Sequence, residues 1–132
     1  MSLGKSLSDI TVKEIMSKKL ISADPSTTLF QIAKMMEQGV GAILVKENGN
    51  PAGIITDRDF AIKIAANKIS LDSTVDKVAS YPLKKIGPND SVQFASEKMS
   101  SLKIRKLAVV ENDSIVGIVT STDIVKLIAS SK

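Results

Sequence analysis

The heptapeptide GIITDRD at residues 53–59 decides how this sequence is interpreted, because GIVTSTD repeats it at residues 117–123. Both copies place a glycine before two β-branched residues, and both end on threonine, two variable residues and aspartate. Other matches occur in the same order: they pair Thr11-Val12 with Thr74-Val75, Pro25 with Pro88 and Met36 with Met99. Because self-similarity at a fixed period marks repeat architectures, we predict a tandem repeat of about sixty residues per copy.

Each copy predicts the element order β-α-β-β-α. In the first copy, residues 20–23 form a short strand, and apolar residues at helical spacing predict a helix that begins at Thr28 and ends at Gly39. Asn48-Gly49 is a strong signal for a hairpin turn, and Asn112-Asp113 takes its place in the second copy. The predicted hairpin strands and last helices span 42–45, 52–56 and 57–67 in the first copy, and 107–110, 115–120 and 122–130 in the second.

A copy of about sixty residues buries too little surface to be comfortable alone. The hairpin strands are apolar on both faces, as expected when helices cover one face of a sheet and a second copy covers the other. We therefore predict an α/β (α+β) fold in which two β-α-β-β-α copies pack with pseudo-two-fold symmetry. The predicted domains are an N-terminal tail (1–10), a first repeat (11–69) and a second repeat (70–132).

The composition of the 132 residues excludes several chemistries. The chain has no Cys and no His, so disulfides, thiol nucleophiles, Cys/His zinc sites and imidazole catalysis are excluded. The net charge of +4 comes mostly from scattered lysines, and 3% of the residues are aromatic, which is a weak signature of nucleic-acid binding. No apolar stretch has the length of a transmembrane helix, so we expect a cytoplasmic protein without membrane contact.

The threonine and aspartate of the repeated heptapeptide occur where a strand turns into a helix. Free backbone N–H groups and the helix dipole favour an anion at such a point. One turn on, the carboxylates of Asp59 and Asp123 could accept hydrogen bonds from a ribose diol. A second interpretation stays open, because threonine followed three residues later by an acid is also a helix capping box. Gly53 and Gly117 would let a ligand or a neighbouring strand approach closely.

In this order and repetition, the motifs resemble a pair of CBS domains, the small modules named after cystathionine β-synthase. The resemblance runs from Thr11 to about Ala129, and these segments carry it: Thr11-Val12-x-x-Ile15-Met16, Asp24-Pro25-x-x-Thr28-Leu29, GIITDRD, Gly87-Pro88, IRKLAVV at 104–110 and GIVTSTD. It implies a disc-shaped regulatory unit rather than a catalyst. Such pairs commonly bind AMP, ADP, ATP or S-adenosylmethionine in two clefts, and they often form homodimers.

The resemblance also implies roles for particular residues. Asp59 and Asp123 would bind the ribose hydroxyls, and Thr56 and Thr120 would contact phosphate or ribose. Basic side chains would hold the phosphate, namely Arg58, Arg105 and Lys106. The adenine would lie beside the first strand of a repeat, near Ile21 and Ser22 or near Lys85 and Ile86. The resemblance implies no catalytic residue and no metal ligand.

The two implied sites are not equivalent. Arg105-Lys106 aligns with Gly41-Ala42, whereas Arg58 aligns with Thr122, so each site lacks a basic contact that the other has. Because a charge-assisted hydrogen bond is worth about 1.5–3 kcal/mol, we predict unequal affinities.

The leading hypothesis is a stand-alone ligand sensor that is not an enzyme, needs no cofactor and signals to a separate effector protein when an adenine nucleotide binds. Two alternatives stay open: a nucleic-acid-binding CBS protein, which the positive net charge favours mildly, and a ligand-free dimerisation scaffold. Nucleotide hydrolysis through Asp57 or Asp59 with a metal is less favoured, because no carboxylates cluster at the spacing of metal ligands.

Overall fold

The computed structural model describes residues 6–130, which form two compact units. Leu20–Leu83 form the first, called the Asp59 unit below, and the described parts of Met1–Lys19 and Lys84–Lys132 form the second, the Asp123 unit. These boundaries differ from the predicted repeat boundaries of 11–69 and 70–132. The residues that open each sequence repeat pack with the hairpin of the other repeat.

Both units contain a three-stranded sheet of the same topology. In the Asp59 unit, β1 (Ser22–Ala23) runs parallel to β2 (Ala42–Glu47), which pairs antiparallel with β3 (Asn50–Thr56). In the Asp123 unit, β4 (Lys85–Ile86), β5 (Lys106–Glu111) and β6 (Ser114–Thr120) repeat this order. The predicted mixed α/β class is therefore confirmed.

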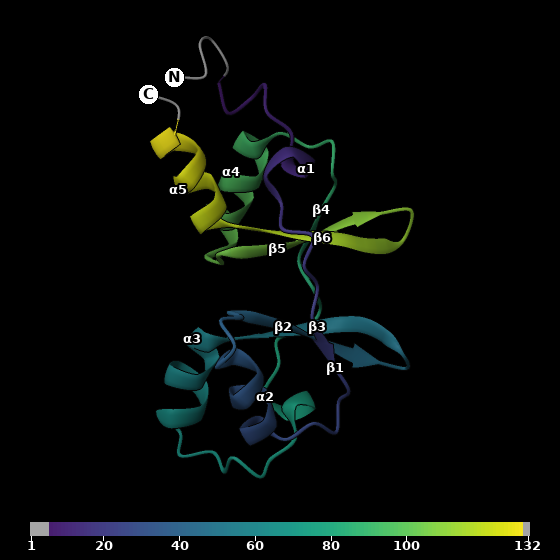
Figure 1. Cartoon of the computed structure of the whole chain (residues 1–132), viewed down its shortest axis with the longest axis vertical. Coiled ribbons are helices and arrows are strands. Elements are labelled where there is room, and N and C mark those ends of the chain that lie inside the picture. Colours follow the sequence, from purple (N-terminus) through teal and green to yellow (C-terminus); the bar gives the residue numbers. More distant parts are fainter. Residues whose placement is uncertain (1–5, 131–132) are drawn as a thin grey trace. The chain divides into compact units, whose positions relative to one another are not determined.

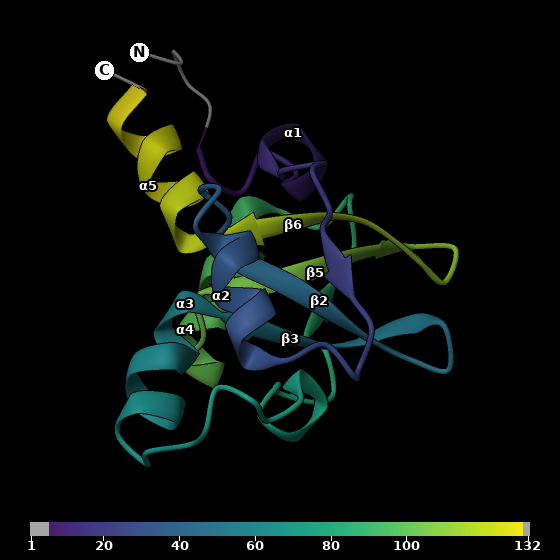
Figure 2. The same cartoon turned by 60° about the horizontal axis from the view of Figure 1, so that its bottom comes forward.

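Helices cover one face of each sheet (Figure 1), and Figure 2 shows both hairpins from a second direction. The Asp59 unit contains α2 (Leu29–Met36), α3 (Asp57–Asp59), a π-helix (Phe60–Ala65) and a 3-10 helix (Val75–Lys77). The Asp123 unit contains α1 (Val12–Ile15), α4 (Val92–Leu102) and α5 (Ser121–Ser130). Each unit has its own core of buried aliphatic side chains between helices and sheet.

Local sequence signals explain where several elements begin and turn. Thr28 caps α2, because its hydroxyl accepts a 3.2 Å hydrogen bond from the Gln31 N–H while the Gln31 side chain accepts one of 3.0 Å from the Thr28 N–H. Asn48 and Gly49 join β2 to β3 with φ of +54° and +82°. Asn112 and Asp113 also have positive φ, as a tight hairpin turn requires. The predicted hairpin turns are confirmed.

The predicted helix over residues 57–67 differs from the observed one. Only Asp57–Asp59 are α-helical, and the chain continues as a π-helix over Phe60–Ala65. The Ala66 N–H donates to the carbonyl of Ala61, five residues back, at 3.2 Å. The apolar pair at positions 60 and 64 does not reveal this wider turn, because the pattern records which side chains face the core and not the hydrogen-bond step.

A fourth segment continues each sheet beyond its third strand. Ser17 and Ile118 exchange backbone hydrogen bonds of 2.8 and 2.9 Å, and Ser80 and Ile54 exchange bonds of 2.9 and 3.1 Å. These segments pass close to Gly53 and Gly117, so the close approach that the two glycines predicted is made by the chain itself.

Candidate ligand-binding site

Several predicted site residues lie on one face of the sheet in the Asp123 unit. Lys106 pairs with Thr120, and Lys85 pairs with Ala108. Paired residues share a face, and so do residues two apart on one strand. One face of this sheet packs against the helices and carries the core residue Val109. The opposite face carries Lys85, Lys106 and Thr120.

The same alternation places two predicted adenine contacts elsewhere. Ile86 is 5% exposed and belongs to the core of the Asp123 unit, while Ile21 packs against the core of the Asp59 unit. Their neighbours Lys85 and Ser22 are exposed. In the Asp123 unit, Ile86 can therefore meet a ligand on the sheet face that carries Lys85 only through its backbone. In the Asp59 unit, the Ile21 side chain is partly buried against the core, whereas that of Ser22 is exposed.

In the Asp123 unit, the threonine–aspartate motif starts α5. The Thr120 N–H donates to Asp123 Oδ2 at 2.9 Å, and the Asp123 N–H donates to Thr120 Oγ1 at 3.1 Å. This is the reciprocal capping that the alternative interpretation predicted. Capping leaves Asp123 Oδ1 without a hydrogen-bond or ion-pair partner among residues 6–130, and the side chain is partly exposed.

In the corresponding motif of the Asp59 unit, both carboxylate oxygens have a partner. Asp59 Oδ2 accepts hydrogen bonds from the Thr56 N–H at 2.8 Å and the Thr56 hydroxyl at 3.2 Å. Asp59 Oδ1 lies 3.4 Å from Lys63 Nζ, and Asp59 is only 8% exposed. Our sequence analysis missed Lys63, although an acid followed by a lysine four residues later is a known helix pairing signal.

The basic residues are also distributed unequally. Lys106 lies beside Thr120 in the sheet, and the carbonyl of Arg105 accepts a 2.9 Å hydrogen bond from the Ser121 N–H. In the Asp59 unit, the carbonyl of Gly41 accepts the equivalent bond from Asp57 at 3.1 Å. The predicted alignment of Arg105-Lys106 with Gly41-Ala42 is thus confirmed. The backbone beside the start of α5 carries two basic residues, Arg105 and Lys106, where the backbone beside the start of α3 carries Gly41 and Ala42.

Two further side chains of the Asp59 unit, Arg58 and Tyr81, differ in charge. The Arg58 side chain is exposed in α3 and makes no ion pair among the described residues. Burial raises the pKa of the Tyr81 phenol, and the carboxylates of Asp76 and Glu47 raise it further. Tyr81 is therefore neutral at physiological pH, so it adds no charge beside β3.

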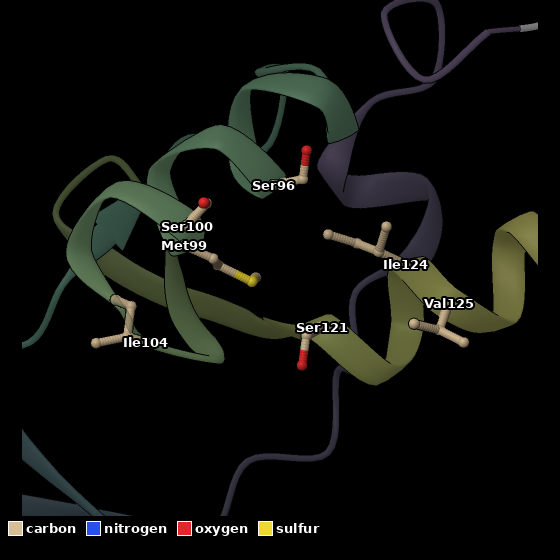
Figure 3. Close-up of a pocket in the computed structure, with 7 residues that line it drawn as sticks. All are labelled: Ser96, Met99, Ser100, Ile104, Ser121, Ile124 and Val125. Atoms are coloured by element: carbon tan, nitrogen blue, oxygen red, sulfur yellow. The ribbon is translucent and has the colours of Figure 1, made fainter.

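A pocket of about 290 Å³ lies between α4 and α5 (Figure 3). Its lining is largely apolar and includes Met99, Ile104, Ile124 and Val125, together with three serines. Residues along an α-helix turn by about 100° each, so Asp123 points away from the α5 face that carries Ile124 and Val125. The pocket therefore adjoins the motif through Ser121, but Thr120 and Asp123 do not belong to its lining.

Residues 6–130 contain neither a metal-ligand cluster nor a membrane-spanning helix. No group of three or more acidic residues among them could hold a metal ion. None of their helices combines the length and apolar character needed to cross a membrane.

The chain is similar to known proteins over most of its length. The family model of the CBS domain matches residues 12–66 and 75–130. The CBS domain-containing protein YhcV of Bacillus subtilis is 36% identical over 115 residues, which are 86% of this chain and 82% of YhcV. Uncharacterized protein MK0525 of Methanopyrus kandleri is 33% identical over 89% of this chain, which spans only 62% of that protein.

Solved structures extend the likeness to the fold. An uncharacterized conserved protein from Pyrococcus horikoshii superposes with a TM-score of 0.87 at 25% identity, covering 97% of this chain and 96% of its own. The CBS domain pair of protein MJ0100 superposes with a TM-score of 0.80 at 30% identity, covering 92% and 98%. That domain pair was crystallised in complex with 5′-methylthioadenosine and S-adenosyl-L-methionine.

Proposed function

Because this chain belongs to the CBS domain family, with two matched segments in tandem, we propose that it is a non-catalytic regulatory module that binds an adenosine-containing ligand. The observation that carries the proposal is the free carboxylate oxygen of Asp123 at the start of α5, with cations beside it. The MJ0100 domain pair supports the ligand class, because its two bound molecules both contain adenosine.

Each group at the start of α5 has a role in this proposal. Asp123 accepts hydrogen bonds from the ribose hydroxyls through Oδ1. The Thr120 oxygen already accepts from the Asp123 N–H, so the hydroxyl proton remains for the ligand. Arg105 and Lys106 attract a phosphate or carboxylate group, and the dipole of α5 adds to that attraction. The adenine contacts predicted beside Ser22 and Lys85 stay predictions.

The cations provide the first test. We expect AMP to raise the melting temperature, and we expect Arg105→Gln with Lys106→Gln to weaken AMP binding at least about tenfold, because two charge-assisted contacts are lost. Binding of 5′-methylthioadenosine, which has no phosphate, should change little. Isothermal titration of both compounds against both proteins measures the difference.

The matched control is Lys126→Gln, which removes an exposed charge from α5 outside the motif. An equal loss for AMP and 5′-methylthioadenosine would contradict the phosphate role of the two cations. If AMP, ADP, ATP, S-adenosylmethionine and 5′-methylthioadenosine all leave the melting temperature unchanged, the proposed function is wrong and a scaffold is favoured. ATP recovered as hydrolysis products would contradict a non-catalytic module.

We also propose a homodimer that covers the pocket between α4 and α5. Val125 lines this pocket and is 64% exposed, and a second copy packed on it would remove apolar surface from water. Val125→Glu should therefore shift the protein from dimer to monomer in light scattering, whereas Lys126→Glu on the same helix should not. A monomeric wild type at micromolar concentration would refute the dimer. The effector protein and the cytoplasmic location stay predictions from the sequence.

A further inference from the structure

The two aspartates of the repeated motif differ because of the residue four positions later. That residue is Lys63 after Asp59 and Leu127 after Asp123. The Lys63 amine lies 3.4 Å from Asp59 Oδ1, the oxygen that the capping bonds leave unused. A leucine offers Asp123 no such partner. The carboxylate of the motif thus pairs with an ammonium group in the Asp59 unit, whereas that of Asp123 has no such partner among the described residues.

Lys63 is held in this position by more than one acceptor. Its amine donates to the Ser80 hydroxyl at 2.8 Å and to the Val78 carbonyl at 3.3 Å. Both acceptors belong to the segment that follows the 3-10 helix. Lys63 therefore joins the π-helix to that segment by hydrogen bonds as well as pairing with Asp59. The Lys63 side chain is 38% exposed and that of Asp59 11%.

A ligand would therefore meet different conditions at the two motifs. To bind through Asp59, ribose hydroxyls would have to displace an ammonium group from a largely buried carboxylate. The displaced ammonium would lose its charged partner while two polar bonds still hold it. At Asp123, the hydroxyls would replace only water. The cost of binding therefore differs even for an identical ligand.

We propose that Lys63 closes the Asp59 motif, so that each chain binds one adenosine-type ligand through Asp123. This inference rests on the proposed function. The unequal affinities predicted from the basic residues around each motif thus have a second cause, the ion pair of Lys63 with Asp59. The exposed Arg58 does not compensate, because it does not release the Asp59 carboxylate from Lys63.

The test is the binding stoichiometry of four proteins, the wild type and three variants, with AMP, ATP and S-adenosylmethionine as probes in isothermal titration. The wild type should bind one molecule per chain. Asp123→Asn keeps an oxygen for the cap but removes the charge, and should weaken binding at least about tenfold. Lys63→Met should bind a second molecule per chain. Lys126→Met, which removes a lysine from α5, is the matched control and should still bind one.

Two results would overturn the inference while leaving the proposed function intact. One is a wild type that binds two molecules of any probe with equal affinity. The other is a Lys63→Met protein that melts cooperatively but still binds only one. No binding of any probe to the wild type would instead refute the proposed function itself. Melting curves of all variants, recorded first, separate loss of binding from loss of folding.

Discussion

Replacing Gly53 by valine is expected to destabilise the Asp59 unit strongly, and replacing Gly117 by valine is expected to destabilise the Asp123 unit strongly. A Cβ at Gly53 would lie 2.8 Å from the Ser80 carbonyl oxygen and 2.5 Å from the Tyr81 ring. The ring could move away, but the carbonyl belongs to the hydrogen-bonded edge segment. We expect the free energy of unfolding to fall by more than about 3 kcal/mol, which is a large part of a total of about 5–15 kcal/mol.

Urea unfolding measures this loss, and Gly41→Ala is its matched control. A Cβ at Gly41 would lie 3.6 Å from an Asp57 carboxylate oxygen, which is ordinary contact, so that variant should stay within about 0.5 kcal/mol of the wild type. Cooperative unfolding of Gly53→Val at the wild-type urea midpoint would show that the edge segment does not pack on the glycine.

Val12→Asp is expected to destabilise the hairpin of the second repeat, although Val12 belongs to the first repeat in sequence. Val12 is 0% exposed in the core of the Asp123 unit, and its N–H donates to the Asp90 carbonyl at 2.8 Å. A carboxylate there would be buried without a partner. We expect the free energy of unfolding to fall by more than about 4 kcal/mol.

Hydrogen exchange locates this effect. In Val12→Asp, protection should be lost from β5 and β6 before β2 and β3. Lys13→Ala, which truncates the next and exposed side chain, should leave protection as in the wild type. If β2 and β3 lose protection first, Val12 packs with its own repeat and the observed unit boundaries are wrong.

Much of the fold could be predicted because its signals are local. The hairpin turns at Asn48-Gly49 and Asn112-Asp113 were predicted, and so was a helix start at about Thr28, where Thr28 caps α2; these features depend on residues within four positions of one another. The short α1 was missed, although its Thr11 and Glu14 form a capping box. The π-helix was missed because side-chain spacing does not record the hydrogen-bond step.

The residues of the candidate site could be predicted from the sequence, but not all of their ion-pair and hydrogen-bond partners could. The repeated motif identified Thr120 and Asp123, and the alignment identified the cations beside them. The alternation of side chains in β4 separates Lys85 from the core-facing Ile86, and it is visible in the sequence as a charged residue beside an apolar one. No pattern in the chain indicates that the Lys63 amine also reaches Ser80 and Val78.

The sequence alone determined that this protein is a tandem repeat of mixed α/β units, each with one threonine–aspartate motif at a helix start. Only the tertiary structure decided which opening segment completes which core, and which of the two carboxylates already pairs with an ammonium group. The physical reason is the range of the contacts. Turns and caps join near neighbours, whereas the bonds of Ser17 to Ile118 and of Lys63 to Ser80 join residues that only the folded chain brings together.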